Sequence, residues 1–254
     1  MPDAFATYHL DVHTRSGQDE LAVRLAERGL VTFGGCHTRG ALSEILSMVC
    51  VPRWHRDSGD DAITVIANTD DEPPPGYLAF GRQELHPHTE GTSIPDPPVV
   101  MALACWTPAR QGGVSYVIDG RALHARLAQD APEALLALSE PRCAYFGGAA
   151  GHLGSVFGPT RDGLLAIRYR RDELGRYSPA AQQAIELLDR LAADCWLELP
   201  LRAGQGFILQ NGRWLHGRTR FSGRRTMARL LGDPLPGTGI RYGFRPDFDV
   251  IRQA

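Results

Sequence analysis

The sequence lacks the features of disulfide-rich, membrane-embedded and nucleic-acid-binding proteins. Its five cysteines are an odd number, they are widely spaced, and no two form a C-x-x-C pair, so neither a disulfide framework nor a thiolate zinc site is predicted. No apolar run approaches the ~18 residues that a membrane-spanning helix needs, and no basic and apolar leader opens the chain. The net charge is −2, without a basic stripe. We therefore expect a cytoplasmic protein with no nucleic-acid or membrane partner.

The composition that remains is that of an ordinary globular protein. Hydrophobic residues make up 43% and charged residues 22% of the 254 positions, which is enough apolar material for a substantial core. No internal repeat divides the chain. We expect residues 1–254 to form a single domain, and the sequence leaves its oligomeric state open.

The order of apolar and turn-forming residues predicts a mainly β fold with helical insertions. Amphipathic spacing predicts helices over residues 18–29, 37–48, 120–138 (restarting at Pro132) and 179–195. Apolar runs predict strands over residues 30–33, 62–67, 84–90, 99–106, 114–119, 196–199, 206–210 and 227–231, with β-hairpins between 143 and 170. Many short strands between Gly and Pro turns favour a jelly-roll barrel, that is, a double-stranded β-helix of the cupin-like type.

The chemistry of the chain is concentrated in His88-Thr89-Glu90 and in a distant partner, His216. Two imidazoles and one carboxylate on one face of a metal leave adjacent positions open, which is the arrangement of non-haem Fe(II) oxygenases. Residues two apart on a strand face the same side, so one strand can present His88 and Glu90, and a second strand must bring His216. His86 and His88 also form an H-x-H pair; we place His86 outside the ligand set.

Four motifs follow one another in an order typical of one enzyme family. They are His88-Thr89-Glu90, Gly112-Gly113-Val114-Ser115, Asn211 through His216-Gly217-Arg218, and Arg225-Thr226-Met227-Ala228-Arg229. The set resembles the clavaminate synthase and taurine dioxygenase (TauD/TfdA) group of Fe(II)- and 2-oxoglutarate-dependent oxygenases. The resemblance covers roughly residues 20–233.

This resemblance implies a role for each motif. His88, Glu90 and His216 are similar to the family's catalytic iron ligands, and Glu90 disfavours halogenation because halogenating relatives have a small residue there. Arg225 resembles the anchor for the far carboxylate of 2-oxoglutarate, with Arg224 as the alternative, and Ser115 stands where relatives have a threonine that assists it. Arg229, four residues beyond Arg225, is the candidate for an anionic group of the substrate.

The resemblance implies a dioxygenase that uses Fe(II), 2-oxoglutarate and O₂ to oxidise a small molecule. Tyr77, His152 and Arg168 are further candidates for the substrate pocket. We expect hydroxylation of a small polar, amino-acid-like metabolite, with desaturation or cyclisation as variants of the same start, and the sequence does not identify the substrate. Two other readings use the same residues: a zinc hydrolase with a His/Glu/His site, or a non-enzymatic protein that binds metal and 2-oxoglutarate.

Overall fold

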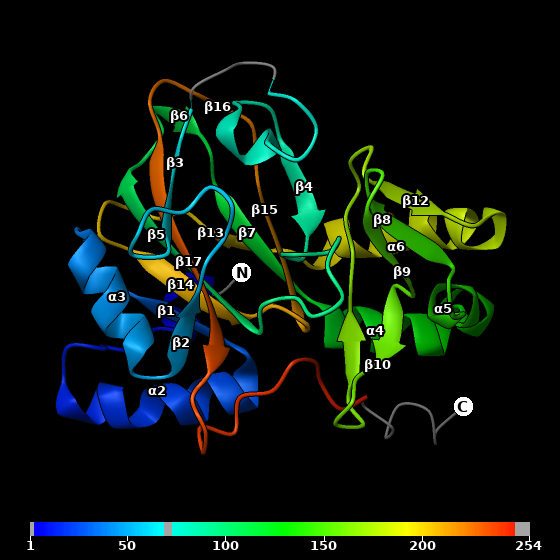
Figure 1. Cartoon of the computed structure of the whole chain (residues 1–254), viewed down its shortest axis with the longest axis horizontal. Helices are drawn as coiled ribbons and strands as arrows, with labels where there is room; N and C mark the ends of the chain where they lie inside the picture. Colours follow the sequence, from blue (N-terminus) through cyan, green and yellow to red (C-terminus); the bar gives the residue numbers. More distant parts are fainter. Residues whose placement is uncertain (1–2, 69–72, 247–254) are drawn as a thin grey trace.

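The protein is built on two antiparallel β-sheets that face each other, the arrangement of a double-stranded β-helix. The structure is a computed structural model, and it describes residues 3–68 and 73–246. The larger sheet has the strand order β1-β14-β5-β17-β2, with β3 also paired to β17, and the smaller has the order β13-β7-β15-β4. The predicted jelly-roll core is confirmed, and Figure 1 shows helices gathered on both sides of it.

The elements have the following bounds. The helices are α1 Ala4–Thr7, α2 Arg15–Arg28, α3 Arg39–Ser47, α4 Gly120–Asp130, α5 Pro132–Ser139 and α6 Pro179–Cys195, with a 3₁₀ helix η1 at Leu78–Phe80. The larger sheet contains β1 Leu30–Phe33, β2 Cys50–Arg53, β3 Ile63–Ala67, β5 Val100–Thr107, β14 Gly206–Gln210 and β17 Thr226–Pro234. The smaller contains β4 Leu85–His88, β7 Ser115–Asp119, β13 Leu197–Leu199 and β15 Trp214–Arg218. Two short pairs are formed by β6 Gln111–Gly112 with β16 Phe221–Ser222 and by β10 Phe157–Pro159 with β11 Leu165–Ile167. A small three-stranded sheet has β8 Ala144–Gly147 between β9 Gly151–Gly154 and β12 Gly175–Tyr177.

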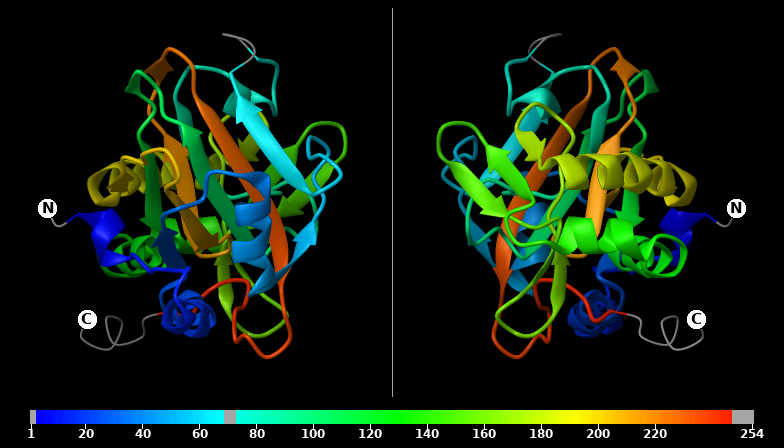
Figure 2. Two further views of the ribbon diagram at one scale, coloured as in Figure 1. Left: turned by 90° about the vertical axis from the view of Figure 1, so that its left-hand side faces the viewer. Right: turned by 90° about the vertical axis from the view of Figure 1, so that its right-hand side faces the viewer.

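Alternation along the strands separates the interior of the barrel from its outer faces. On β5, Met101, Leu103 and Cys105 face the space between the sheets, whereas Ala102 and Ala104 face outward. The outer face of the larger sheet is covered by α2 and α3, and that of the smaller sheet by α4, α5 and α6 (Figures 1 and 2). The predicted period of two therefore places one residue in two inside the barrel, where the site lies.

Local signals explain where the covering helices begin and end. Ser178 caps α6 by accepting a hydrogen bond from the Ala181 N–H, and Pro179 occupies the first turn, where its missing N–H costs nothing. Gly29 ends α2 in the left-handed conformation, with φ of 68°. These signals are local, and the predicted boundaries of both helices are close to those observed.

One predicted element is shorter than expected, and another is confirmed together with its restart at Pro132. The strand expected over 84–90 ends at His88, because the N–H of Thr89 donates to the Tyr169 carbonyl and the chain leaves the sheet there. The helix expected over 120–138 is two helices, α4 and α5, that meet at Ala131, where Pro132 starts a new first turn as predicted. Among the described residues, no helix is long and apolar enough to cross a bilayer.

Candidate metal centre

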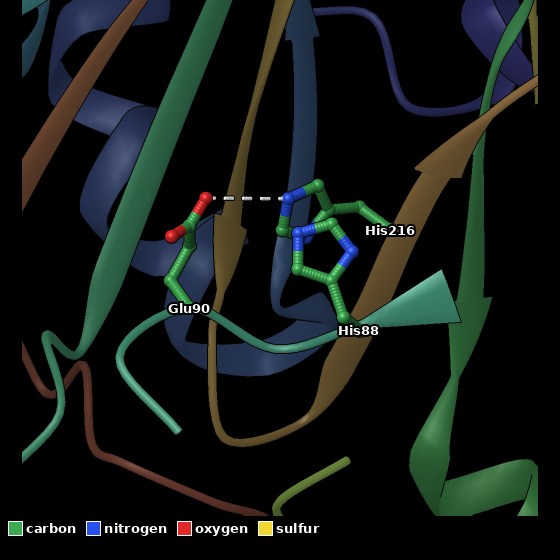
Figure 3. Close-up of side chains that lie close together, drawn as sticks. All are labelled: His88, Glu90 and His216. Carbon is green, nitrogen blue, oxygen red and sulfur yellow. Dashed lines mark ion pairs between the residues drawn. The ribbon is translucent and has the colours of Figure 1, made fainter. Parts of the chain in front are cut away.

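Three side chains converge inside the barrel: His88 at the end of β4, Glu90 in the turn beyond it, and His216 within β15. His88, Glu90 and His216 each offer one ligand atom, and these atoms lie within 4.8 Å of one another. The two imidazole rings are 4.3 Å apart between centroids, and Nε2 of His216 lies 3.5 Å from Oε1 of Glu90 (Figure 3). Two imidazole nitrogens and one carboxylate oxygen in this arrangement suit a divalent transition metal with coordination positions left open.

Strand register brings the two histidines together. His88 is the last residue of β4, and it lies directly opposite His216 of β15 in the antiparallel ladder. Directly paired residues on one face have side chains within contact distance, so the ladder fixes the pair. Glu90 comes from the turn beyond β4 and not from the strand itself.

The ring of His88 is oriented for ligation. Its Nδ1 lies 2.9 Å from the backbone carbonyl of His86, so Nδ1 carries the proton and Nε2 keeps its lone pair. Burial, together with His216, lowers the pKa of His88 to about 3, which keeps the ring neutral. His86 thus contributes its carbonyl and stands outside the ligand set, where the sequence analysis placed it.

Glu90 is a buried carboxylate held by an arginine. Its Oε1 accepts a hydrogen bond of 2.8 Å from Nη1 of Arg229. Burial raises the pKa of Glu90, but Arg229 and His216 outweigh that effect and hold it well below the usual value. The carboxylate is therefore ionised and ready to bind a cation.

A cavity of about 300 Å³ opens at this cluster. His88, Glu90 and Arg229 form part of its wall, together with His55 and Arg170. His55 accepts at Nδ1 from the Asp57 N–H (3.3 Å) and lies 3.2 Å from Nη2 of Arg229, so its other nitrogen carries the proton. His55 and Arg170 were not predicted, because neither stands in a motif and only the folding of β2 and of the segment after β11 brings them here.

A second buried cluster lies at the start of β17, where Arg225 directly precedes the strand. Arg225 and Arg229 are four residues apart and both point into the barrel, as predicted from the period of a strand. Nη2 of Arg225 lies 3.4 Å from Oγ of Ser115, and both residues line a cavity of about 160 Å³. Arg224 is exposed. Arg225, not Arg224, is therefore the one of the two beside Ser115.

Arg225 is a buried cation without a buried counter-charge. It forms no ion pair with any residue of ranges 3–68 and 73–246. Burial lowers its pKa only to about 10, so the guanidinium remains a cation at neutral pH. Arg218 is a second buried guanidinium close to Arg225. Burial, together with Arg225, lowers the pKa of Arg218 to about 10. Buried cations are normally paired, so this end of the barrel is suited to an anion from outside the chain.

Two of the three remaining predicted substrate residues, Arg168 and His152, lie away from the metal cavity. Arg168 donates to the backbone carbonyls of Thr92, Ile94 and Pro95, and with His152 it lines a different cavity of about 740 Å³. The structure does not bring these two residues to the metal cavity. Tyr77 lies beside that cavity, where its ring packs on the guanidinium of Arg56 at 4.2 Å.

The chain is similar to known oxygenases over most of its length. The family model described as "Taurine catabolism dioxygenase TauD, TfdA family" matches residues 5–231. A uridine-5'-phosphate dioxygenase of a Streptomyces species is 27% identical over 197 residues, which are 71% of this chain and 71% of that protein.

Solved structures show the same fold at low sequence identity. Asparagine oxygenase in complex with Fe(II), 2S,3S-3-hydroxyasparagine and succinate superposes with a TM-score of 0.67 at 16% identity, covering 91% of this chain and 85% of that one. The non-heme iron oxygenase OrfP in complex with Fe and alpha-ketoglutaric acid gives 0.63 at 17% identity, covering 91% and 86%.

Proposed function

Because this chain belongs to the taurine catabolism dioxygenase TauD, TfdA family, we propose that His88, Glu90 and His216 hold its Fe(II) and that its substrate is a small polar molecule. The protein is an Fe(II)- and 2-oxoglutarate-dependent dioxygenase. The bound metal, with 2-oxoglutarate and O₂, supplies the oxidising chemistry, and succinate and CO₂ are the by-products. We propose hydroxylation of a C–H bond as the outcome. We also propose that residues 1–254 form a single domain.

The observation that carries the proposal is the pair of sites on one barrel interior. One end holds a set of two imidazoles and a carboxylate, and the other holds Arg225 beside Ser115 with no acidic partner among the described residues. A dicarboxylate fits both, because one end can chelate the metal and the far carboxylate can accept a hydrogen-bonded fork from Arg225. A zinc hydrolase has no use for the second site, so that alternative is not favoured.

The chain's own residues then act by positioning. Oε1 of Glu90 is held by Arg229, which keeps the carboxylate ionised and limits its rotation. The carbonyl of His86 fixes the proton of His88 on Nδ1, so that Nε2 points at the metal position. The buried walls of the barrel exclude water from the reacting groups, and this strengthens each of these contacts.

We propose a substrate with both a cationic and an anionic group, as in an amino acid. The metal cavity is lined by acid and base together: Arg56 contacts Asp57, and Arg170 contacts Asp172. Such paired walls match a zwitterion better than a neutral or a single-charged ligand, since each charge finds its opposite. The bound hydroxyasparagine of asparagine oxygenase is of this kind.

The function is tested by anaerobic titration of the protein with Fe(II) in the presence of 2-oxoglutarate. We expect the weak visible metal-to-ligand charge-transfer band in the wild type and its loss in His88→Ala. A wild-type protein that binds Zn²⁺ tightly but shows no band at any 2-oxoglutarate concentration would falsify the proposal. Substrate-stimulated succinate release, measured over a panel of amino acids with uridine 5'-phosphate as the contrasting class, then tests the substrate proposal.

A further inference from the structure

Asn211 belongs to one of the sequence motifs, but it has no role in the metal and 2-oxoglutarate sites described above. It follows the last residue of β14 and opens the turn that leads into β15, the strand of His216. Its side chain is completely buried, with 0% of its surface exposed. A buried primary amide needs partners for one acceptor and two donor positions, so its contacts show what it holds.

The amide of Asn211 is bonded to the backbone of a metal ligand. Its Oδ1 accepts a hydrogen bond of 2.7 Å from the N–H of Glu90. Its Nδ2 donates to the carbonyl of Glu90 at 2.9 Å and to the carbonyl of Pro98 at 2.8 Å. One side chain therefore satisfies both backbone groups of Glu90.

Glu90 needs such a partner because it lies outside the sheet. β4 ends at His88, so no ladder hydrogen bonds fix the backbone at Glu90. Thr89 is held by the backbone of Tyr169. The Thr89 N–H donates to the Tyr169 carbonyl at 2.9 Å, and the Thr89 Oγ1 accepts from the Tyr169 N–H at 3.2 Å. The Asn211 amide does for Glu90 what a neighbouring strand does for His88.

Asn211 also closes the loop that follows Glu90. Its own backbone N–H donates to the carbonyl of Val99 at 2.9 Å, so the residue contacts the start of the loop at Glu90 and its end at Pro98 and Val99. The carboxylate ligand and the strand of the distal histidine are thereby joined through one residue, over 121 positions of sequence.

We infer that Asn211 is a positioning residue that holds the backbone of Glu90, and through it the carboxylate ligand, at a fixed distance from His216. The inference rests on the metal site of the proposed function. Without the amide, the buried N–H and carbonyl of Glu90 lose their partners, and Glu90 is then held only through its carboxylate, by Arg229 and His216. Only a side chain with one acceptor and two donors at this length meets all three backbone groups; aspartate cannot donate, and glutamine is longer.

The test measures metal affinity directly, without 2-oxoglutarate or turnover. Co(II) is titrated into wild type, Asn211→Ala and Asn211→Ser under one buffer, and its visible absorption spectrum and the dissociation constant are recorded with the thermal midpoint of each protein. Partners behind metal ligands typically change affinity by about 10- to 100-fold. We expect a loss of that size for Asn211→Ala, a smaller loss for Asn211→Ser, and an altered Co(II) spectrum in both.

A matched control separates positioning from general stability. Thr32→Val removes another hydrogen bond made by a fully buried residue, from Thr32 Oγ1 to the Phe5 carbonyl, on β1 at the edge of the larger sheet. We expect it to lower the thermal midpoint and leave Co(II) affinity and spectrum unchanged. The inference is overturned if folded Asn211→Ala and Asn211→Ser bind Co(II) as the wild type does, or if Thr32→Val weakens binding equally. If the wild type binds no metal, the proposed metal site and this inference are both refuted. If the wild type binds Co(II) and the Asn211 variants bind it equally well, only this inference is refuted and the proposed function stands.

Discussion

At the scale of the residue, Arg225 and Arg229 show how two arginines on one strand face take different partners. Arg229 already donates to the ionised carboxylate of Glu90, whereas the Arg225 guanidinium has the Ser115 hydroxyl at 3.4 Å and the Phe221 ring, with no acidic partner among the described residues. The free-energy cost of burying the Arg225 cation is therefore unmet until an anion arrives. The structure shows Arg229 bonded to Glu90, and its contact with an anionic group of the substrate stays a prediction.

Arg225→Ala is expected to weaken 2-oxoglutarate binding strongly. Truncating one partner of a buried, hydrogen-bonded charge pair costs roughly 2–5 kcal/mol, which corresponds to an increase in the dissociation constant of about 30-fold or more. The dissociation constant is measured anaerobically from the visible band as 2-oxoglutarate is added to the Fe(II) protein. Arg224→Ala, which removes the exposed neighbour, serves as the control; equal losses in the two variants would show that the anchor is not Arg225.

At the scale of the element, the turn between β6 and β7 packs closely against the stem of Arg225, which directly precedes β17. Gly113 in this turn has φ of 69°, a conformation that residues with a side chain adopt only at a cost. A Cβ there would lie 3.2 Å from Cδ of Arg225 and 3.1 Å from Cβ of Ala109. The Gly-Gly pair of the motif thus leaves room for the arginine stem.

Gly113→Ala should lower both stability and affinity for 2-oxoglutarate. The left-handed backbone costs roughly 1–2 kcal/mol with an alanine, and the added methyl displaces the Arg225 stem. Gly163→Ala is a matched control, because Gly163 has φ of 72° but no atom within 4 Å of an added Cβ. Urea unfolding should show similar losses in the two variants, and 2-oxoglutarate titration a loss in Gly113→Ala alone; unchanged 2-oxoglutarate affinity in Gly113→Ala would contradict this view of the turn.

At the scale of the whole molecule, the two sheets and their covering helices enclose separate apolar layers. His124 lies in one of them, on α4, where its ring packs edge-on against Phe157 and Phe244. Burial lowers the pKa of His124 from its ordinary value of 6.5. The unfolded chain therefore binds a proton at higher pH than the folded protein does.

This difference predicts a loss of stability in acid. The contribution of neutral His124 is fully present above pH 6.5 and is lost as the pH falls from there toward the lowered folded value, because unfolding then takes up a proton. Replacing His124 with Leu should reduce the slope of the unfolding free energy against pH by at most one proton, about 1.4 kcal/mol per pH unit. Urea unfolding between pH 5 and about pH 8 measures the slope; the exposed His37→Gln is the control, and equal slopes in His124→Leu and wild type would refute the assignment.

The sequence by itself determined the repeating and local features of this protein. Apolar runs indicated most strands, and amphipathic spacing indicated α2 and α6. The spacing of Arg225 and Arg229 predicted that both face the same side; Arg229 lies on β17 and Arg225 directly precedes it. The H-x-E pattern and His216 predicted the three side chains whose ligand atoms the fold brings within 4.8 Å of one another. These features depend on neighbours within a few positions, or on motif order, and both can be read along the chain.

Only the tertiary structure decided which distant groups meet. The pairing of His88 with His216, the contact of Arg229 with Glu90 and the bond of Asn211 to the Glu90 backbone join residues more than 100 positions apart. Arg168, a predicted substrate residue, donates to carbonyls of the Thr92–Pro95 loop, which lie more than 70 positions away in the sequence. A long polar side chain can satisfy its hydrogen bonds in many directions, and the packing of the sheets selects one of them.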